Sequence, residues 1–157
     1  MGRRRMAMTA LVGLLVLVGA CGSSGGSNGG AKAGTAAGSK AGTVNVTLKD
    51  FAISPNLGTV KSGPVTFDIE NKGPSQHEFV VIRSDFTPAQ LPLTQEQGVP
   101  IVDEEAAGLE GMGEREDINS GANTTLSLNL APGHYLFICN LPSHFQLGMV
   151  AQFTVAP

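Results

Sequence analysis

Three residues near the C-terminus have side chains that could bind one metal ion together. Cys139, His144 and Met149 offer a thiolate, an imidazole and a thioether at the spacing C-x4-H-x4-M. These donors are softer than carboxylate or water, and they suit copper, which alternates between a soft Cu(I) and a harder Cu(II). The cysteine ends one apolar run and the methionine opens the next. We therefore expect a loop between them that could wrap one copper ion.

A second nitrogen donor is available upstream at His77. It follows the turn sequence Asn71-Lys72-Gly73-Pro74, so it is expected to open a strand. Its parity puts it on the same face of that strand as Phe79. Two histidines and a thiolate in a plane, with a long axial bond to Met149, would form the trigonal arrangement of blue copper sites.

Each candidate ligand also has a simpler interpretation. Cys139 could be a buried apolar residue, His77 a hydrogen-bonded residue at a strand end, and Met149 ordinary core packing. His144 lies in a Pro-Ser-His-Phe loop, where a core role is not expected. His134 precedes Cys139 by five residues, so it should face the other side of the strand, about 16 Å away. We interpret His134 as a surface residue.

The motifs around these residues resemble the plastocyanin/azurin group of cupredoxins. They are Asn71-Lys72-Gly73 leading to His77-Glu78-Phe79, and Pro132-Gly133-His134-Tyr135 leading to Cys139, His144 and Met149. The resemblance covers nearly all of residues 43–157. It implies one copper ion, Cu(I)/Cu(II), and a function in one-electron transport.

One position departs from the pattern of that family. Its members often carry asparagine directly after the first ligand histidine, where the side chain braces the ligand loops. Here that position holds Glu78, while Asn140 follows the cysteine. We expect the bracing to be reversed or replaced.

The chain after residue 42 has the pattern of a β-protein. Apolar residues alternate with polar ones in the segments 44–48, 65–69 and 126–130. The run 77–82 is more uniformly apolar, which predicts a strand covered on both sides. Segments 134–139 and 149–155 predict two more strands, and turns rich in Gly and Pro separate them all. These features predict an all-β, Greek-key β-sandwich of seven to eight strands.

Residues 84–121 lack clear alternation and are rich in proline, glycine and acid. Between residues 96 and 117 there are eight carboxylates and one base, Arg115. We interpret this part as an acidic insert that is irregular or short-helical, with apolar residues at helical spacing near 103–110. Met112 and its neighbouring carboxylates could bind a second metal, but a solvated loop is the preferred interpretation.

The first 42 residues are expected to lie outside the fold. Residues 1–20 combine a basic start, an apolar stretch too short to be the usual membrane span, and small residues before Cys21, which indicates an export signal. The ending Leu-Val-Gly-Ala-Cys resembles a bacterial lipobox, which implies a lipid on Cys21; an ordinary cleavage site is the alternative. Residues 22–42 are nearly all Gly, Ser and Ala and predict a flexible tether.

Removal of the signal changes the charge balance. It leaves 7 basic and 13 acidic residues, a net charge of −6. A chain this acidic is a poor candidate for nucleic-acid binding, and its membrane association should come from acyl chains rather than basic patches. The expected location is extracytoplasmic, anchored to the cell membrane through Cys21.

The resemblance implies electron transfer with redox partner proteins, possible partners including a membrane oxidase. Four protein ligands leave no coordination position for a substrate, so an enzyme is not expected. The main alternative is extracytoplasmic copper storage, sensing or delivery, and a third is an interaction module without metal. Leu141, Pro142, Phe145 and Leu147 crowd around His144 and form either a partner-docking rim or ordinary loop packing.

Overall fold

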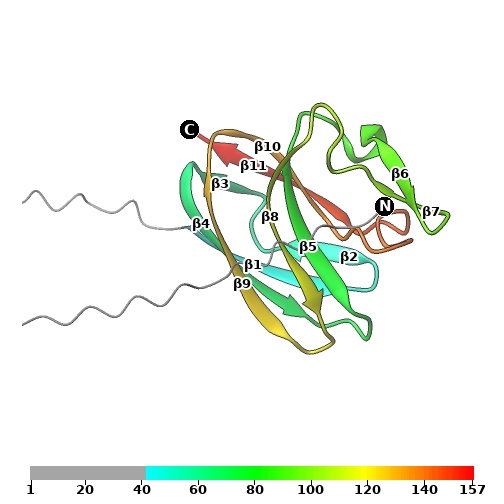
Figure 1. Ribbon diagram of the computed structural model, residues 1–157. Helices are drawn as coiled ribbons and strands as arrows, with labels where there is room; N and C mark the ends of the chain where they lie inside the picture. Colours follow the sequence, from blue (N-terminus) through cyan, green and yellow to red (C-terminus); the bar gives the residue numbers. More distant parts are fainter. Residues whose placement is uncertain (1–41) are drawn as a thin grey trace, which may run out of the picture. The chain divides into compact units, whose positions relative to one another are not determined.

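The computed structural model describes residues 42–157; the signal, Cys21 and nearly all of the tether predicted from the sequence lie outside them. The described residues form two β-sheets that pack face to face (Figure 1). One sheet has the strand order β2-β1-β4-β9 and the other β3-β11-β10-β5-β8, while β6 and β7 form a separate hairpin. The predicted all-β sandwich is confirmed. No helix within residues 42–157 is long and apolar enough to cross a membrane.

The strands are β1 (Gly42–Lys49), β2 (Ala52–Pro55), β3 (Thr59–Lys61), β4 (Gly63–Asn71), β5 (His77–Arg83), β6 (Leu93–Glu96), β7 (Val99–Val102), β8 (Glu110–Ile118), β9 (Asn123–Leu130), β10 (Gly133–Ile138) and β11 (Val150–Ala156), with a 3-10 turn η1 (Pro88–Gln90) after β5. There are more strands than the predicted seven to eight. The additional strands β2, β3, β6 and β7 are only three or four residues long, which is too short to show an alternating pattern in the sequence.

The alternating segments bury their apolar residues between the two sheets. Phe67 of β4 lies at the centre, with ring centroids 5.6 Å from Phe79, 5.2 Å from Phe137 and 6.0 Å from Phe153 of the opposite sheet. Such tilted and edge-on aromatic contacts add to the burial of apolar area. This core holds the strands that carry the candidate ligands.

A second apolar cluster covers the other face of β5 and β10. Its buried members are Val80 and Ile82 of β5, Leu136 and Ile138 of β10, and Leu91 and Val102 of the segment that follows β5. The run 77–82 is therefore covered on both sides, as its composition predicted. The segment between β5 and β8 therefore packs over this face of the sheet, and β8 itself joins the sheet as its edge strand.

Of the two forms expected for the insert, irregular or short-helical, residues 103–109 adopt the irregular one, and no helix forms there. Residues 103–109 form turns, and β8 starts at Glu110 and pairs with β5. Gly108 has φ +91°, a value outside the right-handed helical region. The apolar spacing arises because Val102 and Leu109 both pack on the second cluster from a loop.

This packing predicts different effects at two nearby leucines. Leu91 is 6% exposed and lies in the second cluster, whereas Leu93 is 52% exposed. We expect Leu91→Ala to lower the free energy of unfolding by about 2–5 kcal/mol, because it leaves a cavity under the insert. Leu93→Ala should change it by less than about 0.5 kcal/mol. Urea unfolding of the two variants measures both values, and equal losses would contradict the covering role of the insert.

Candidate metal centre

The predicted ligands come from positions where strands begin or end. His77 is the first residue of β5. Cys139 directly follows β10, and Met149 directly precedes β11, so residues 140–148 form a loop between two paired antiparallel strands. The hydrogen-bonded pairing of β10 with both β5 and β11 places these strand ends next to one another.

Three donor atoms converge at this end of the sandwich. The Nδ1 atoms of His77 and His144 are 3.3 Å apart, and the Cys139 sulfur lies 3.3 Å from the Nδ1 of His144 and 4.0 Å from that of His77. His77 and Cys139 are fully buried, and His144 is partly exposed. Burial lowers the pKa of His144, so its ring is neutral at pH 7 and keeps a lone pair for a metal.

Met149 is buried at the same place. Its backbone N–H donates to the carbonyl of His144 at 3.1 Å, and its carbonyl accepts the N–H of Cys139, also at 3.1 Å. Its side chain is 0% exposed and belongs to the same core cluster as Cys139. The hydrogen bond between Cys139 and Met149, the two residues that flank the loop, thus closes it. Axial coordination by the Met149 sulfur stays a prediction.

A carboxylate that the sequence interpretation missed orients His77. Asp50, the residue after β1, has its Oδ1 2.9 Å from the Nε2 of His77. An ionised carboxylate only accepts hydrogen bonds, so Nε2 carries the proton and the Nδ1 lone pair points toward Cys139 and His144. A 2.7 Å hydrogen bond from the Ser75 hydroxyl lowers the pKa of Asp50 and helps to keep it ionised.

Strand parity is the signal that could have identified this carboxylate. Asp50 continues the inward-facing positions of Val46 and Leu48 in β1, where a charged residue is unexpected. Asn71 likewise ends the inward series of β4 and is 0% exposed. Its side chain donates to two backbone carbonyls and accepts the N–H of Gly73, which fixes the turn before His77.

The chemistry of Cys139 fits a bound cation. Burial raises the pKa of this unpaired thiol to about 11, although the N–H of Glu78 donates to its sulfur at 3.4 Å. At neutral pH such a thiol keeps its proton unless a metal ion replaces it. One thiolate and two imidazoles are a donor set that suits copper. The residues present therefore fit the metal that the sequence indicated.

The structure shows how the ligand loops are braced without the usual asparagine. The carboxylate of Glu78 accepts the backbone N–H of Asn140 at 2.5 Å. The Asn140 side chain accepts the N–H of Val102 at 2.7 Å and donates to the carbonyl of Val102 and to Glu104. Burial raises the pKa of Glu78 to about 7, and the negative charge of Glu104 adds to the effect. The acidic insert is thereby joined to the ligand loop.

The four apolar residues around His144 divide into two kinds. Phe145 packs against the second cluster and Leu141 against the main core. Pro142 and Leu147 are exposed, Leu147 by 57%. Phe51 was not singled out from the sequence, yet its ring meets His144 edge-on at 5.2 Å between centroids. Partner docking at this rim stays a prediction.

His134 and Met112, which were not expected to bind the copper ion, both lie away from the metal centre. His134 is exposed on β10, as expected for a surface residue. Met112 is half-buried on β8 and packs against the main core, so the expectation of a solvated loop is wrong there. Within residues 42–157, His77, Cys139 and His144 are the one group of His, Cys, Asp and Glu side chains close enough to share an ion, with all ligand atoms within 4.8 Å.

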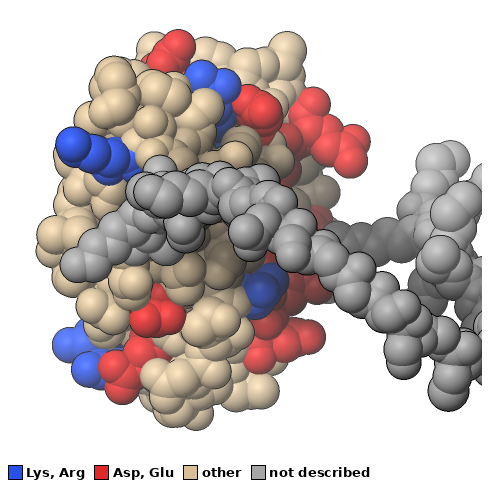
Figure 2. All heavy atoms as spheres, turned by 90° about the vertical axis from the view of Figure 1, so that its left-hand side faces the viewer, with Lys and Arg blue, Asp and Glu red and all other residues tan. Residues whose placement is uncertain are grey.

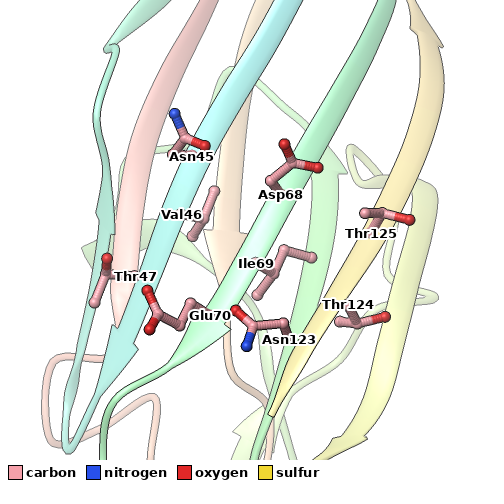
Figure 3. Close-up of a pocket in the computed structure, with 9 residues that line it drawn as sticks. All are labelled: Asn45, Val46, Thr47, Asp68, Ile69, Glu70, Asn123, Thr124 and Thr125. Carbon is pink, nitrogen blue, oxygen red and sulfur yellow. The ribbon is translucent and has the colours of Figure 1, made fainter. Parts of the chain in front are cut away.

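A shallow pocket of about 370 Å³ lies on the outer face of the sheet formed by β1, β4 and β9 (Figure 3). Its outward-facing walls are polar and come from Asn45, Thr47, Asp68, Glu70, Asn123 and Thr125. None of the candidate metal ligands lines it. It is separate from the candidate metal centre.

The chain is similar to known proteins in sequence and in fold. A family described as "Cupredoxin-like domain" matches residues 14–151. Among curated proteins, none matches the chain. The solved structure of dithionite-reduced auracyanin from the photosynthetic bacterium Roseiflexus castenholzii is similar, with 22% sequence identity and a TM-score of 0.55. The match covers 73% of this chain and 97% of the auracyanin chain. Auracyanin B is also similar, with 21% identity, coverages of 74% and 90%, and a TM-score of 0.53. These likenesses show the fold.

Proposed function

The chain belongs to the cupredoxin-like domain family, and from that premise we propose that it is an exported, membrane-tethered blue copper protein that carries single electrons. The observation that carries the proposal is the convergence of a buried thiol and two imidazole nitrogens within 4.8 Å. One copper ion would supply the Cu(I)/Cu(II) couple. His77, Cys139 and His144 would hold it, with the Met149 thioether as a fourth ligand.

Contacts within the protein support a carrier rather than a catalyst. Asp50 holds the His77 ring through its Nε2, and the backbone N–H of Glu78 donates to the Cys139 sulfur. The hydrogen bond between Glu78 and Asn140 ties the two ligand segments together. A site held in this way needs little rearrangement when its charge changes. The protein supplies every proposed ligand, whereas catalytic metals keep an open position for substrate. His144 is the partly exposed ligand, and we assign electron entry and exit to its edge.

A visible spectrum of the copper-loaded protein combined with a redox titration tests this function. An intense blue Cu(II) form that titrates reversibly with one electron, and keeps its copper over repeated cycles, is the expected result. Loss of copper to a competing chelator on each reduction would favour the alternative of copper delivery. A colourless Cu(II) complex would contradict a blue copper site altogether.

The start of the fold supports an orientation for the proposed anchor. β1 begins at Gly42, where the tether sequence ends, and runs toward the other end of the sandwich (Figure 1). Asp50 lies just beyond that other end, and its carboxylate contacts His77. Eight strand residues span about 26 Å. A lipid on Cys21 would thus hold the domain by the end opposite the metal centre, leaving His144 accessible to redox partners outside the cytoplasm.

The charge of the domain bears on the partner. Residues 42–157 hold all 13 acidic residues of the chain against 5 basic ones. Figure 2 shows the face that lies on the left in Figure 1, away from the metal centre, and there carboxylates gather toward the right-hand side while Lys and Arg are scattered. Glu104, Glu114 and Glu116 lie near enough to Glu78 to raise its pKa. Acids of the insert therefore flank the metal centre, which favours a basic redox partner.

We expect Glu116→Gln combined with Asp117→Asn to slow electron exchange with a cationic reagent such as hexaammineruthenium by a few-fold at low salt, on the order of 3-fold, because steering weakens. The difference should shrink as salt screens exposed charges. Glu104 is left intact because it contacts Asn140. Stopped-flow rates measure the effect, with Asp68→Asn on the outer face of β4 as control; equal rates in both variants would contradict steering.

Met149→Leu should leave copper bound and raise the reduction potential. The loss of a weak axial donor disfavours Cu(II) more than Cu(I), and a tenfold change in that preference corresponds to about 59 mV. Met112→Leu is the matched control, since Met112 is a core-packed methionine of β8. A potentiometric titration measures the reduction potential of both variants. The same potential in both would mean that Met149 packs near the site without coordinating the copper ion.

A further inference from the structure

The contact between Asp50 and His77 links a buried ligand to the surface. The His77 side chain is 0% exposed, and the Asp50 side chain is 24% exposed. Their 2.9 Å contact joins the ring nitrogen that faces away from the other donors to a carboxylate. Ser75 donates to both oxygens of this carboxylate, through its hydroxyl at 2.7 Å and its backbone N–H at 3.4 Å. The carboxylate is therefore held from two sides.

The neighbouring turn leaves room for this pair only because it contains Gly73. A Cβ atom at that position would lie 2.6 Å from the Asp50 carboxylate and 3.0 Å from the Nε2 of His77. The turn is itself fixed, since Asn71 accepts the N–H of Gly73 at 2.9 Å and the Ser120 hydroxyl donates to its carbonyl at 2.6 Å. The hydrogen bonds fix the turn, and the absence of a side chain at Gly73 leaves the space. Both features therefore permit the contact between the Asp50 carboxylate and the His77 imidazole.

We propose that Asp50 is a positioning residue that aims the Nδ1 of His77 at the copper ion and makes the site favour Cu(II) over Cu(I); this inference rests on the proposed function. A carboxylate that accepts the second N–H of a ligand histidine fixes the ring and makes it a stronger donor. Its negative charge also acts more strongly on the doubly charged ion than on the singly charged one. Asp50 thereby lowers the reduction potential without touching the metal.

Two substitutions separate charge from orientation. Asp50→Asn keeps an oxygen that can accept the Nε2–H but removes the charge, so it should bind copper and shift the preference toward Cu(I) by about tenfold, a rise of about 59 mV. Asp50→Ala removes both, and copper affinity should fall by about 10- to 100-fold. Asp68→Asn removes an exposed carboxylate from the outer face of β4 and controls for net charge.

A third measurement needs no metal. Nitrogen NMR of the imidazoles in the metal-free protein should show His77 protonated at Nε2 alone, with the same tautomer in Asp50→Asn and a mixture of tautomers in Asp50→Ala. An unchanged tautomer in Asp50→Ala, or equal potentials in Asp50→Asn and Asp68→Asn, would overturn the inference. Failure of the unaltered protein to bind copper would overturn the proposed function instead, and the NMR result would still decide the orienting role.

Discussion

Cys139→Ser is expected to abolish the intense visible colour of the Cu(II) protein. That absorption requires a copper–thiolate bond, and Cys139 is the one cysteine among residues 42–157. The serine hydroxyl is a poor copper ligand, so affinity should fall together with the colour. An absorption spectrum and a copper determination on the same sample measure both effects. A variant that stays deep blue would show that Cys139 is not a ligand.

The fold should survive this substitution. Serine nearly matches the shape of cysteine, and its oxygen can accept the Glu78 N–H that now donates to the sulfur. Burial of the hydroxyl should cost about 1–3 kcal/mol at most. His134→Ala is the matched control, because this exposed histidine lies on β10, the strand that ends just before Cys139. It should leave colour and affinity unchanged, so loss of colour there would point to unfolding rather than to the site.

The sequence predicted the positions of the candidate ligands well because they obey local rules. His77 opens a strand after a turn, and Cys139 and Met149 sit where one apolar run stops and the next begins. Parity and turn chemistry are properties of neighbouring residues, which a single sequence displays. The convergence of three donor atoms from these positions follows once the strands pair.

The contacts that orient the ligands could not be predicted in the same way. Asp50 and His77 are 27 positions apart, and Asn140 and Val102 are 38 apart. These pairs depend on how the sheets face each other and where the insert folds back, and neither is visible in local periodicity. The single local sign of Asp50 was a charged residue directly after β1, at a position that continues the inward-facing series of that strand.

The packing of the insert against the core was not predicted, because its apolar residues are spread over short elements. Leu91, Val102 and Leu109 each contribute one side chain to the second cluster, from a turn, a strand end and a loop. Val102 and Leu109 are seven positions apart, so their spacing imitates two turns of a helix although one side chain comes from a strand end and the other from a loop. The insert is joined to the ligand loop by Asn140 and by Gln146, whose amide donates to the carbonyl of Pro100 at 2.5 Å. A segment that seemed irregular therefore supports the metal centre.

Cys21→Ala is expected to move the protein from the membrane fraction to the soluble extracytoplasmic fraction while its copper spectrum stays the same. The candidate ligands and the core that holds them belong to residues 42–157, so loss of the proposed acyl chains should remove the anchor and leave the site in place. Cell fractionation measures the location, and the intact mass shows whether the signal was cleaved and whether an acyl group is present. Ser23→Ala, two residues further on, should stay in the membrane. An unaltered chain that is soluble and carries no acyl mass would contradict the anchor, and the ordinary cleavage site would then be the correct interpretation of residues 17–21.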